Sequence, residues 1–417
     1  MEQSVWQTRW VIGCFFSLVL VAFFLPISES LTDISYLMAF ACAVVSGVAW
    51  TYRLELIKHP VIIVLLLLLA MIVSGLTYSG TFGNAHTWKL LKTYLWVLAT
   101  PFLLLAIRDD QQRRVIFHAF LWANALILCV SFGKLIAGWL GGYQANPCVF
   151  RGHIIHNFFM SFASAIWLYL AIKRPQYRRW MVGLFILSTL NVFLVTSRTG
   201  YLNWFVLVAL VMVCELSWRR CLILGAALVS LVGGFIMLSP MFLQRMDKAV
   251  TEVVQHVDNK DPIAHPTSMG IRVVQLTSGW HLFMQKPWLG YGTGGAPQAF
   301  SAFHAKTPNE RYVYDRGDIR TDLTYINVAV EHGILGLTIL LAFILTLWCV
   351  ACRLPAEWRR IAQCFVVAYF VAAIFTAFLI SSFAVHALSM MLVVLYGGYQ
   401  YSNDQDFVSG SEQPVST

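Results

Sequence analysis

Apolar runs long enough to cross a lipid bilayer recur along almost the whole 417-residue sequence. A spanning helix needs about 20 mostly apolar residues, and in lipid the chain must satisfy its own backbone hydrogen bonds. Composition agrees, because 59% of the residues are hydrophobic and only 12% are charged, whereas about 25% charged residues is usual in soluble domains. The sequence therefore predicts an all-α integral membrane protein.

We expect about twelve transmembrane helices. The first run is preceded by Arg9 and has no cleavage site of small residues after it, so we expect it to be retained as a span. The predicted spans are residues 10–27, 34–50, 60–78, 91–107, 115–137, 154–172, 180–197, 200–216, 221–239, 324–349, 361–380 and 384–400.

This reading divides the chain into four regions. Residues 1–239 hold helices one to nine, and residues 240–323 form a large loop domain. Residues 324–400 hold the last three helices. Residues 401–417 are a short polar cytoplasmic tail that we expect to be disordered.

The distribution of Lys and Arg orients the predicted bundle. With the N-terminus in the cytoplasm, 15 of the 29 basic residues fall in short cytoplasmic loops, five in short loops of the other side and nine in the long loop. Short cytoplasmic loops of membrane proteins are enriched in Lys and Arg. The net charge of +9 therefore indicates topology and not nucleic-acid binding, and it places the long loop in the periplasm of a bacterial inner membrane.

The long loop is expected to contain amphipathic helices that lie along the bilayer or cover a cavity. One begins at Ser239 and Pro240, a good cap and first turn. Another ends before Pro287, and the glycines of "WLGYGTGG" then mark tight turns. The predicted apolar face of this second helix consists of Val273, Leu276, Trp280, Phe283 and Met284.

Arg198, in "TSRTGY", lies on the periplasmic turn between the seventh and eighth spans. An arginine here either snorkels to lipid headgroups or grips a phosphate with its planar guanidinium. Arg272, in the second loop helix, belongs to a solvated helix face or is a second phosphate ligand. Arg151, with His153 and His156 beside it, is a third candidate, although such histidines often serve packing alone.

Asp322 is expected at the outer start of the tenth span, as a helix cap or a general base. Glu331 and His332 lie about 15 Å further along that helix at 1.5 Å per residue. We expect them to pair with other spans, and we expect Gly333 and Gly336 to allow close helix packing.

Several cations and one carboxylate at a periplasmic membrane face favour a reaction on a lipid-linked pyrophosphate. Arginines would stabilise the charge of the leaving group, and a base would take the proton of the attacking hydroxyl. The sequence has neither the ligand spacing of a zinc site nor a carboxylate cluster for magnesium. We expect no metal or other cofactor.

Four stretches, "FRGHIIHNFFMSFA", "TSRTGY", "SMGIRVVQLTSGWHLFMQKPWLGYGTGG" and "VAVEHGILGL", together resemble the bacterial O-antigen ligase family and its related polymerases and O-oligosaccharyltransferases. The resemblance covers roughly residues 145 to 340. It implies a metal-independent, inverting glycosyltransferase of lipopolysaccharide biosynthesis. Such an enzyme moves a glycan from undecaprenyl pyrophosphate to lipid A–core oligosaccharide or another glycan acceptor, and Arg198 and Arg272 would bind the pyrophosphate.

The chain departs from the family pattern at one position. The family has a histidine followed by Asn, Ser or Gln, then nine residues, then G-x-x-G. Counted back from Gly333, these two positions hold Asp322 and Leu323 in this sequence. Asp322 could be the base, with a pKa that burial raises. His153 and His304 are the alternatives.

Two other functions remain open. A repeat-unit polymerase would use the same donor, with a second lipid-linked glycan as acceptor. A lipid or anion transporter is less favoured, because such proteins usually show repeats and charges at mid-membrane. The short C-terminal tail also disfavours transfer to proteins.

Overall fold

The computed structural model describes residues 5–52, 58–143, 145–195, 197–238, 268–306 and 323–399. Within these ranges the chain is helical and has no β-strand, which confirms the predicted all-α fold. The long helices of the first half are α1 (Val5–Phe24), α2 (Glu29–Val45), α5 (Pro60–Ser79), α6 (Ala85–Ala106), α7 (Asp110–Leu140) and α8 (His153–Lys173). Those of the second half are α9 (Arg178–Leu194), α10 (Arg198–Glu215), α11 (Trp218–Leu238), α13 (Ser268–Gln285), α14 (Ala296–Lys306), α15 (Thr324–Arg353), α16 (Ala356–Phe375) and α17 (Ser382–Tyr396).

Every predicted span overlaps one of these helices, with bounds that differ by several residues in places. Among the described residues, eight helices are long and apolar enough to cross a membrane, so the chain is a multi-pass membrane protein. The exact count of twelve stays a prediction, because four of the matching helices are not among these eight: α2, α9, α11 and α17.

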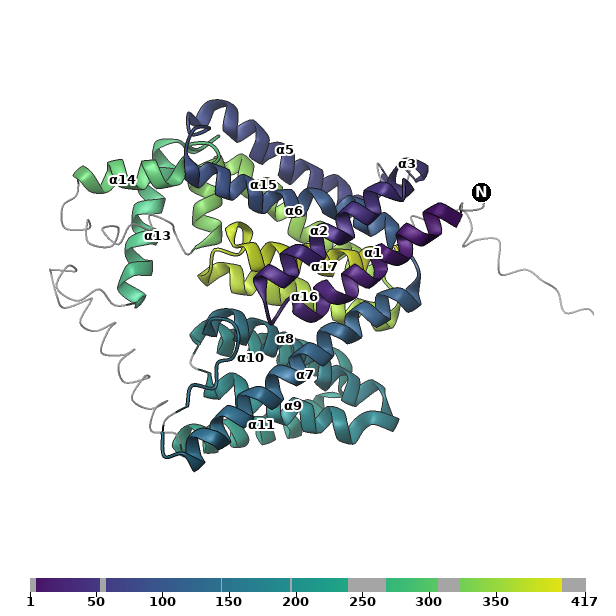
Figure 1. Cartoon of the computed structure of the whole chain (residues 1–417). Coiled ribbons are helices and arrows are strands. Elements are labelled where there is room, and N and C mark those ends of the chain that lie inside the picture. Colours follow the sequence, from purple (N-terminus) through teal and green to yellow (C-terminus); the bar gives the residue numbers. More distant parts are fainter. Residues whose placement is uncertain are drawn as a thin grey trace, which may run out of the picture.

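The helices form two groups that meet along α16 and where α7 packs on α1 (Figure 1). One group contains α1, α2, α5, α6, α15 and α17, and the other contains α7 to α11. Helix α16 packs on α15 in the first group and on α8 and α10 in the second. Helices α13 and α14 lie at one end of the bundle, and the N-terminus lies at the other (Figure 1).

Helix α17 shows how burial shapes the sequence. Its residues from Phe383 to Tyr396 are all buried, and it carries apolar residues on every side, as expected for a helix at the centre of a bundle. Outer helices such as α1 instead alternate buried residues with exposed apolar ones, Phe16 among them, because their outer face meets lipid.

Of the predicted loop domain, the structure describes α13 and α14 and the segment that joins them. The helix predicted to begin at Ser239 lies outside the described residues. Helix α13 confirms the second predicted loop helix and ends at Gln285, just before Pro287.

Candidate functional site

Arg198 is the first residue of α10, and its side chain is exposed. Ser197 caps the helix, with its Oγ accepting from the backbone N–H of Gly200 at 3.4 Å. Helix α9 ends at Leu194, so the arginine sits on a tight turn between two antiparallel helices. The Arg198 guanidinium therefore lies at the N-terminus of α10, where the helix dipole is positive. Both charges favour the binding of an anion there.

Asn157, on α8, fixes the position of this turn through hydrogen bonds to the end of α9. Its fully buried side-chain amide donates to the carbonyls of Val192 at 3.1 Å and Val195 at 2.8 Å, at the C-terminal end of α9. Gly200 allows the contact, because a Cβ there would lie 2.5 Å from the Asn157 Cβ. Buried contacts therefore set the position from which Arg198 reaches outward.

His153 begins α8 at the same end of the molecule. Asn203 and Trp204 of α10 donate to Ser161 and Ser164 of α8, at 3.2 Å and 3.1 Å, so the two helices run parallel and in register. Their first residues, His153 and Arg198, are both exposed at this shared end. The structure thus brings these two predicted residues onto one face.

Arg151 forms an ion pair and a hydrogen bond with other residues of the protein. Its Nη1 lies 3.1 Å from the Glu29 carboxylate and its Nη2 donates to the carbonyl of Leu25 at 3.3 Å. Burial lowers the pKa of the Arg151 guanidinium, and the charge of Glu29 opposes this shift. Arg151 therefore ties the loop before α8 to the corner between α1 and α2, and its predicted pyrophosphate role stays a prediction.

An acidic pair beside Arg151 is visible in the fold but was not expected from the sequence. Glu29 and Asp33 lie one turn apart on α2, and the Asp33 carboxylate is 3.2 Å from Nε2 of the buried His386. Tyr36 and Trp96 surround the histidine ring, with centroids 5.4 Å and 4.8 Å away. Only the fold brings α2 and α17 together here, so no local sequence signal could have indicated the pair.

Arg272 belongs to a different part of the fold. It lies half-buried in the second turn of α13, which packs on α14 and α15. The core of this contact consists of Val274, Leu282, Phe300 and Val330. The predicted apolar face of α13 points outward instead: Val273, Leu276, Trp280 and Met284 are 40%, 50%, 53% and 53% exposed.

The glycine segment, residues 287–295, joins α13 to α14 and enters a break in α15. At Gly333 the α15 backbone is not helical, with φ 61° and ψ −153°. The segment supplies the bonds that the break removes: Pro287 O accepts from Ile334 N at 2.8 Å, and Gly292 N donates to Glu331 O at 2.7 Å. Irregular backbone at membrane depth is tolerated where protein buries it in this way.

Contacts of Glu331 correct our expectation for this helix. Its carboxylate does not pair with another span but accepts backbone N–H groups of Gly294, at 3.1 Å, and of Ala296, where α14 begins. It therefore binds the positive N-terminus of α14. Gly333 likewise serves the backbone break and not helix packing, since a Cβ there would lie 2.4 Å from the Trp288 carbonyl oxygen.

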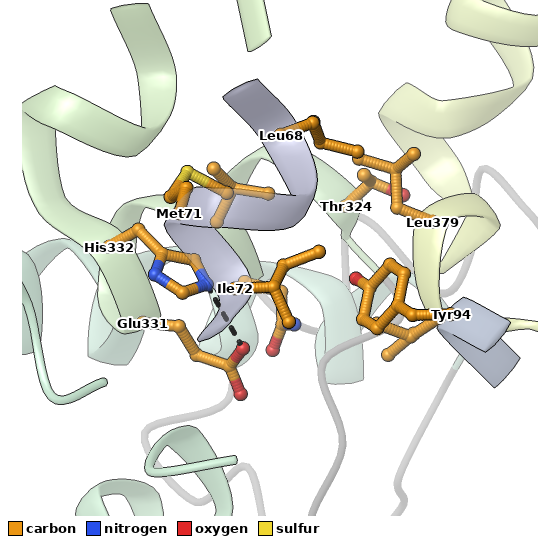
Figure 2. Close-up of a pocket in the computed structure, with 11 residues that line it drawn as sticks. Leu68, Met71, Ile72, Tyr94, Thr324, Glu331, His332 and Leu379 are labelled. Atoms are coloured by element: carbon orange, nitrogen blue, oxygen red, sulfur yellow. Dashed lines mark ion pairs between the residues drawn. The ribbon is translucent and has the colours of Figure 1, made fainter. Parts of the chain in front are cut away.

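Figure 2 shows His332 beside Glu331, with 3.8 Å between their nearest nitrogen and oxygen. Both line a small cavity that Leu68, Met71 and Tyr94 close from α5 and α6. Its volume of about 10 Å³ is enough for one water molecule at most. The cavity is too small for a sugar, so Glu331 and His332 hold the architecture around it.

The two other candidate bases differ in what the structure shows. Asp322 lies outside the described residues, directly before Leu323, the residue that precedes α15. His304 is 2% exposed on α14 and stacks on Phe300, with an 8° angle between the rings. Such burial favours a packing role for His304 over that of a base.

Comparison with known families identifies residues 183–341 as matching the family model described as O-antigen ligase. The match contains Arg198, Arg272, Asp322 and the α15 break, and it excludes the stretch around Arg151 and His153. The resemblance to this family is thereby confirmed, over a shorter range than the predicted 145 to 340. No curated protein matches the chain.

Proposed function

We propose that this multi-pass membrane protein, which matches the O-antigen ligase family model over residues 183–341, transfers a glycan from undecaprenyl pyrophosphate to a sugar hydroxyl of lipid A–core oligosaccharide. The family supports a glycosyltransferase of O-antigen ligase or polymerase type in lipopolysaccharide synthesis. The ligase reaction, the inner membrane and a periplasmic active site are our proposal.

The observation that carries the proposal is the rigid presentation of Arg198. A membrane-edge arginine that merely snorkels needs no fixed backbone. Here a buried asparagine, a glycine contact and a helix cap hold the turn. Such preorganisation suits a group that stabilises developing charge on a leaving pyrophosphate.

In the proposed reaction, Arg198 and Arg272 bind the pyrophosphate of the donor. As the bond between the glycan anomeric carbon and the pyrophosphate oxygen breaks, their guanidinium groups neutralise the oxygen that leaves. A base takes the proton of the acceptor hydroxyl as that oxygen attacks from the opposite face, and configuration inverts. Asp322 remains our first candidate for the base, and the exposed His153 is the second.

The test is the glycan profile of a strain that lacks the protein. If it is the ligase, polymerised glycan should accumulate on undecaprenyl pyrophosphate while lipid A carries bare core, because donor synthesis continues without its final acceptor step. Lipopolysaccharide gels and mass spectrometry of the lipid-linked glycans measure both pools. Single repeat units on the carrier and on the core would indicate the polymerase, and an unchanged profile would contradict both enzymes.

Asp322→Asn should reduce the turnover rate by about 10²-fold or more if Asp322 is the base, because the amide cannot accept the hydroxyl proton. The measurement is transfer from purified lipid-linked donor to acceptor, at equal amounts of membrane protein. His153→Asn is the matched comparison. If Asp322→Asn retains its rate and His153→Asn loses it, the base is His153 and not Asp322.

A further inference from the structure

A cavity of about 450 Å³ opens at the end of the bundle opposite to Arg198. It lies between the start of α7, the end of α8, the start of α9 and the first turn of α16. This is the basic end of the bundle, which the distribution of Lys and Arg assigns to the cytoplasm. None of the residues that line it takes part in the proposed reaction.

Polarity changes along the depth of this cavity. On α7 its lining runs from Arg114 through His118 and Leu121 to Ala125, a distance of about 16 Å at 1.5 Å per residue. On α8 and α9 it runs in the same direction, from Arg174 and Tyr177 to Leu170 and Leu184. The charged groups thus gather at the mouth, and the deep part is apolar.

Two arginines at the mouth converge on one carboxylate. Arg114 Nη1 lies 2.8 Å from Oε2 of Glu357, and Arg174 Nη2 lies 2.9 Å from its Oε1. The side chains of Arg114 and Arg174 remain 40% and 44% exposed. Arginines bind phosphate in the same way, with guanidinium groups that donate to its oxygen atoms.

Among the residues that line the mouth, the arginines outnumber the carboxylates. Arg114 and Arg174 line it together with Glu357, so two positive charges face one negative charge. Asp110, which is not part of the lining, binds Arg113 at 2.8 Å and Arg114 at 2.6 Å, and the charge of Asp109 acts on Arg113 as well. An anionic headgroup would meet two partly exposed guanidinium groups at the mouth, whereas a neutral ligand would use neither charge.

We propose that this cavity binds an anionic phospholipid, with the phosphate at Arg114 and Arg174 and an acyl chain in the apolar depth. Basic pockets between transmembrane helices on the cytoplasmic side are a known way to hold anionic headgroups. A soluble phosphate would use the mouth alone and leave the apolar lining, which includes Leu121, Leu170 and Leu184, in contact with water. The site is independent of the proposed glycan transfer.

Native mass spectrometry of the full chain in detergent tests the site, with phosphatidylglycerol and phosphatidylcholine as probes. We expect the wild type to retain phosphatidylglycerol preferentially. In the double variant Arg114→Gln/Arg174→Gln that retention should fall about thirtyfold, because two arginines each contribute roughly 1 kcal/mol to anionic-lipid binding. The matched control is Arg219→Gln/Arg220→Gln, which removes two exposed charges from the same end outside the cavity and should retain the lipid.

Ala125→Phe fills the apolar depth without changing charge, so it decides the question even if the double arginine variant does not fold. It should lower phosphatidylglycerol retention while thermal unfolding stays cooperative. Unchanged retention in Ala125→Phe, or equal retention of the two lipids by the wild type, would overturn the proposal. Displacement of phosphatidylglycerol by millimolar inorganic phosphate would also overturn it, in favour of a soluble anion.

Discussion

Replacing Arg198 with alanine should lower glycan transfer by about 10³-fold or more, because an arginine that neutralises a leaving phosphate is worth that much in phosphoryl-transfer enzymes. Its side chain is exposed and its backbone is held by α8 and α9. The substitution should therefore leave folding unchanged. Transfer from a lipid-linked donor, at matched protein levels in the membrane, measures the loss.

Two companion variants separate charge from geometry. Arg198→Lys keeps the charge but loses the bidentate geometry, so we expect it to recover only part of the rate. Gly200→Ala keeps the arginine but places a Cβ 2.5 Å from that of Asn157, which should push α10 off α8 and misplace Arg198. A misplacement of about 1 Å can cost about 10²-fold. Wild-type activity in Arg198→Ala would refute the pyrophosphate role.

Hydropathy was sufficient to predict the helices, because each span must satisfy its own backbone bonds in lipid and so leaves a contiguous apolar run. The place of Arg198 on a tight turn between two helices was also predictable, since a charge in so short a turn between apolar runs stands out locally. Asn157 did not stand out, because its role depends on the carbonyls of α9, which pack against it only in the folded bundle.

Two contacts could not be predicted from the sequence, for physical reasons. The apolar face of α13 was expected to lie along the bilayer or cover a cavity, and its contacts with α14 and α15 use Val274, Leu282 and the small Gly279 instead. Periodicity shows that a helix has an apolar side and does not say whether protein or lipid covers it. Likewise, nothing local to "EHGILG" reveals that the partner of Glu331 is a loop 37 positions earlier.

Gly333→Ala should destabilise the protein by about 3 kcal/mol or more, since its φ of 61° with ψ of −153° falls in a region that only glycine adopts readily. The added Cβ would also lie 2.4 Å from the Trp288 carbonyl oxygen. If α15 straightened to relieve this strain, Gly292 N would lose its acceptor on Glu331. The glycine segment would then leave α15, and α13 with Arg272 would move. Thermal unfolding in detergent and the transfer rate should both decline.

Gly183→Ala is the matched control, because Gly183 lies in the middle of α9 and a Cβ there would meet nothing within 4 Å. Alanine favours helix over glycine by up to about 1 kcal/mol, so this variant should be neutral or slightly more stable. If only Gly333→Ala is destabilised, the protein requires the backbone break in α15. If both variants are destabilised, the bundle does not tolerate an added side chain at either glycine. Equal stability and activity of the two variants would mean that α15 functions as a continuous helix and that the glycine segment does not position the loop.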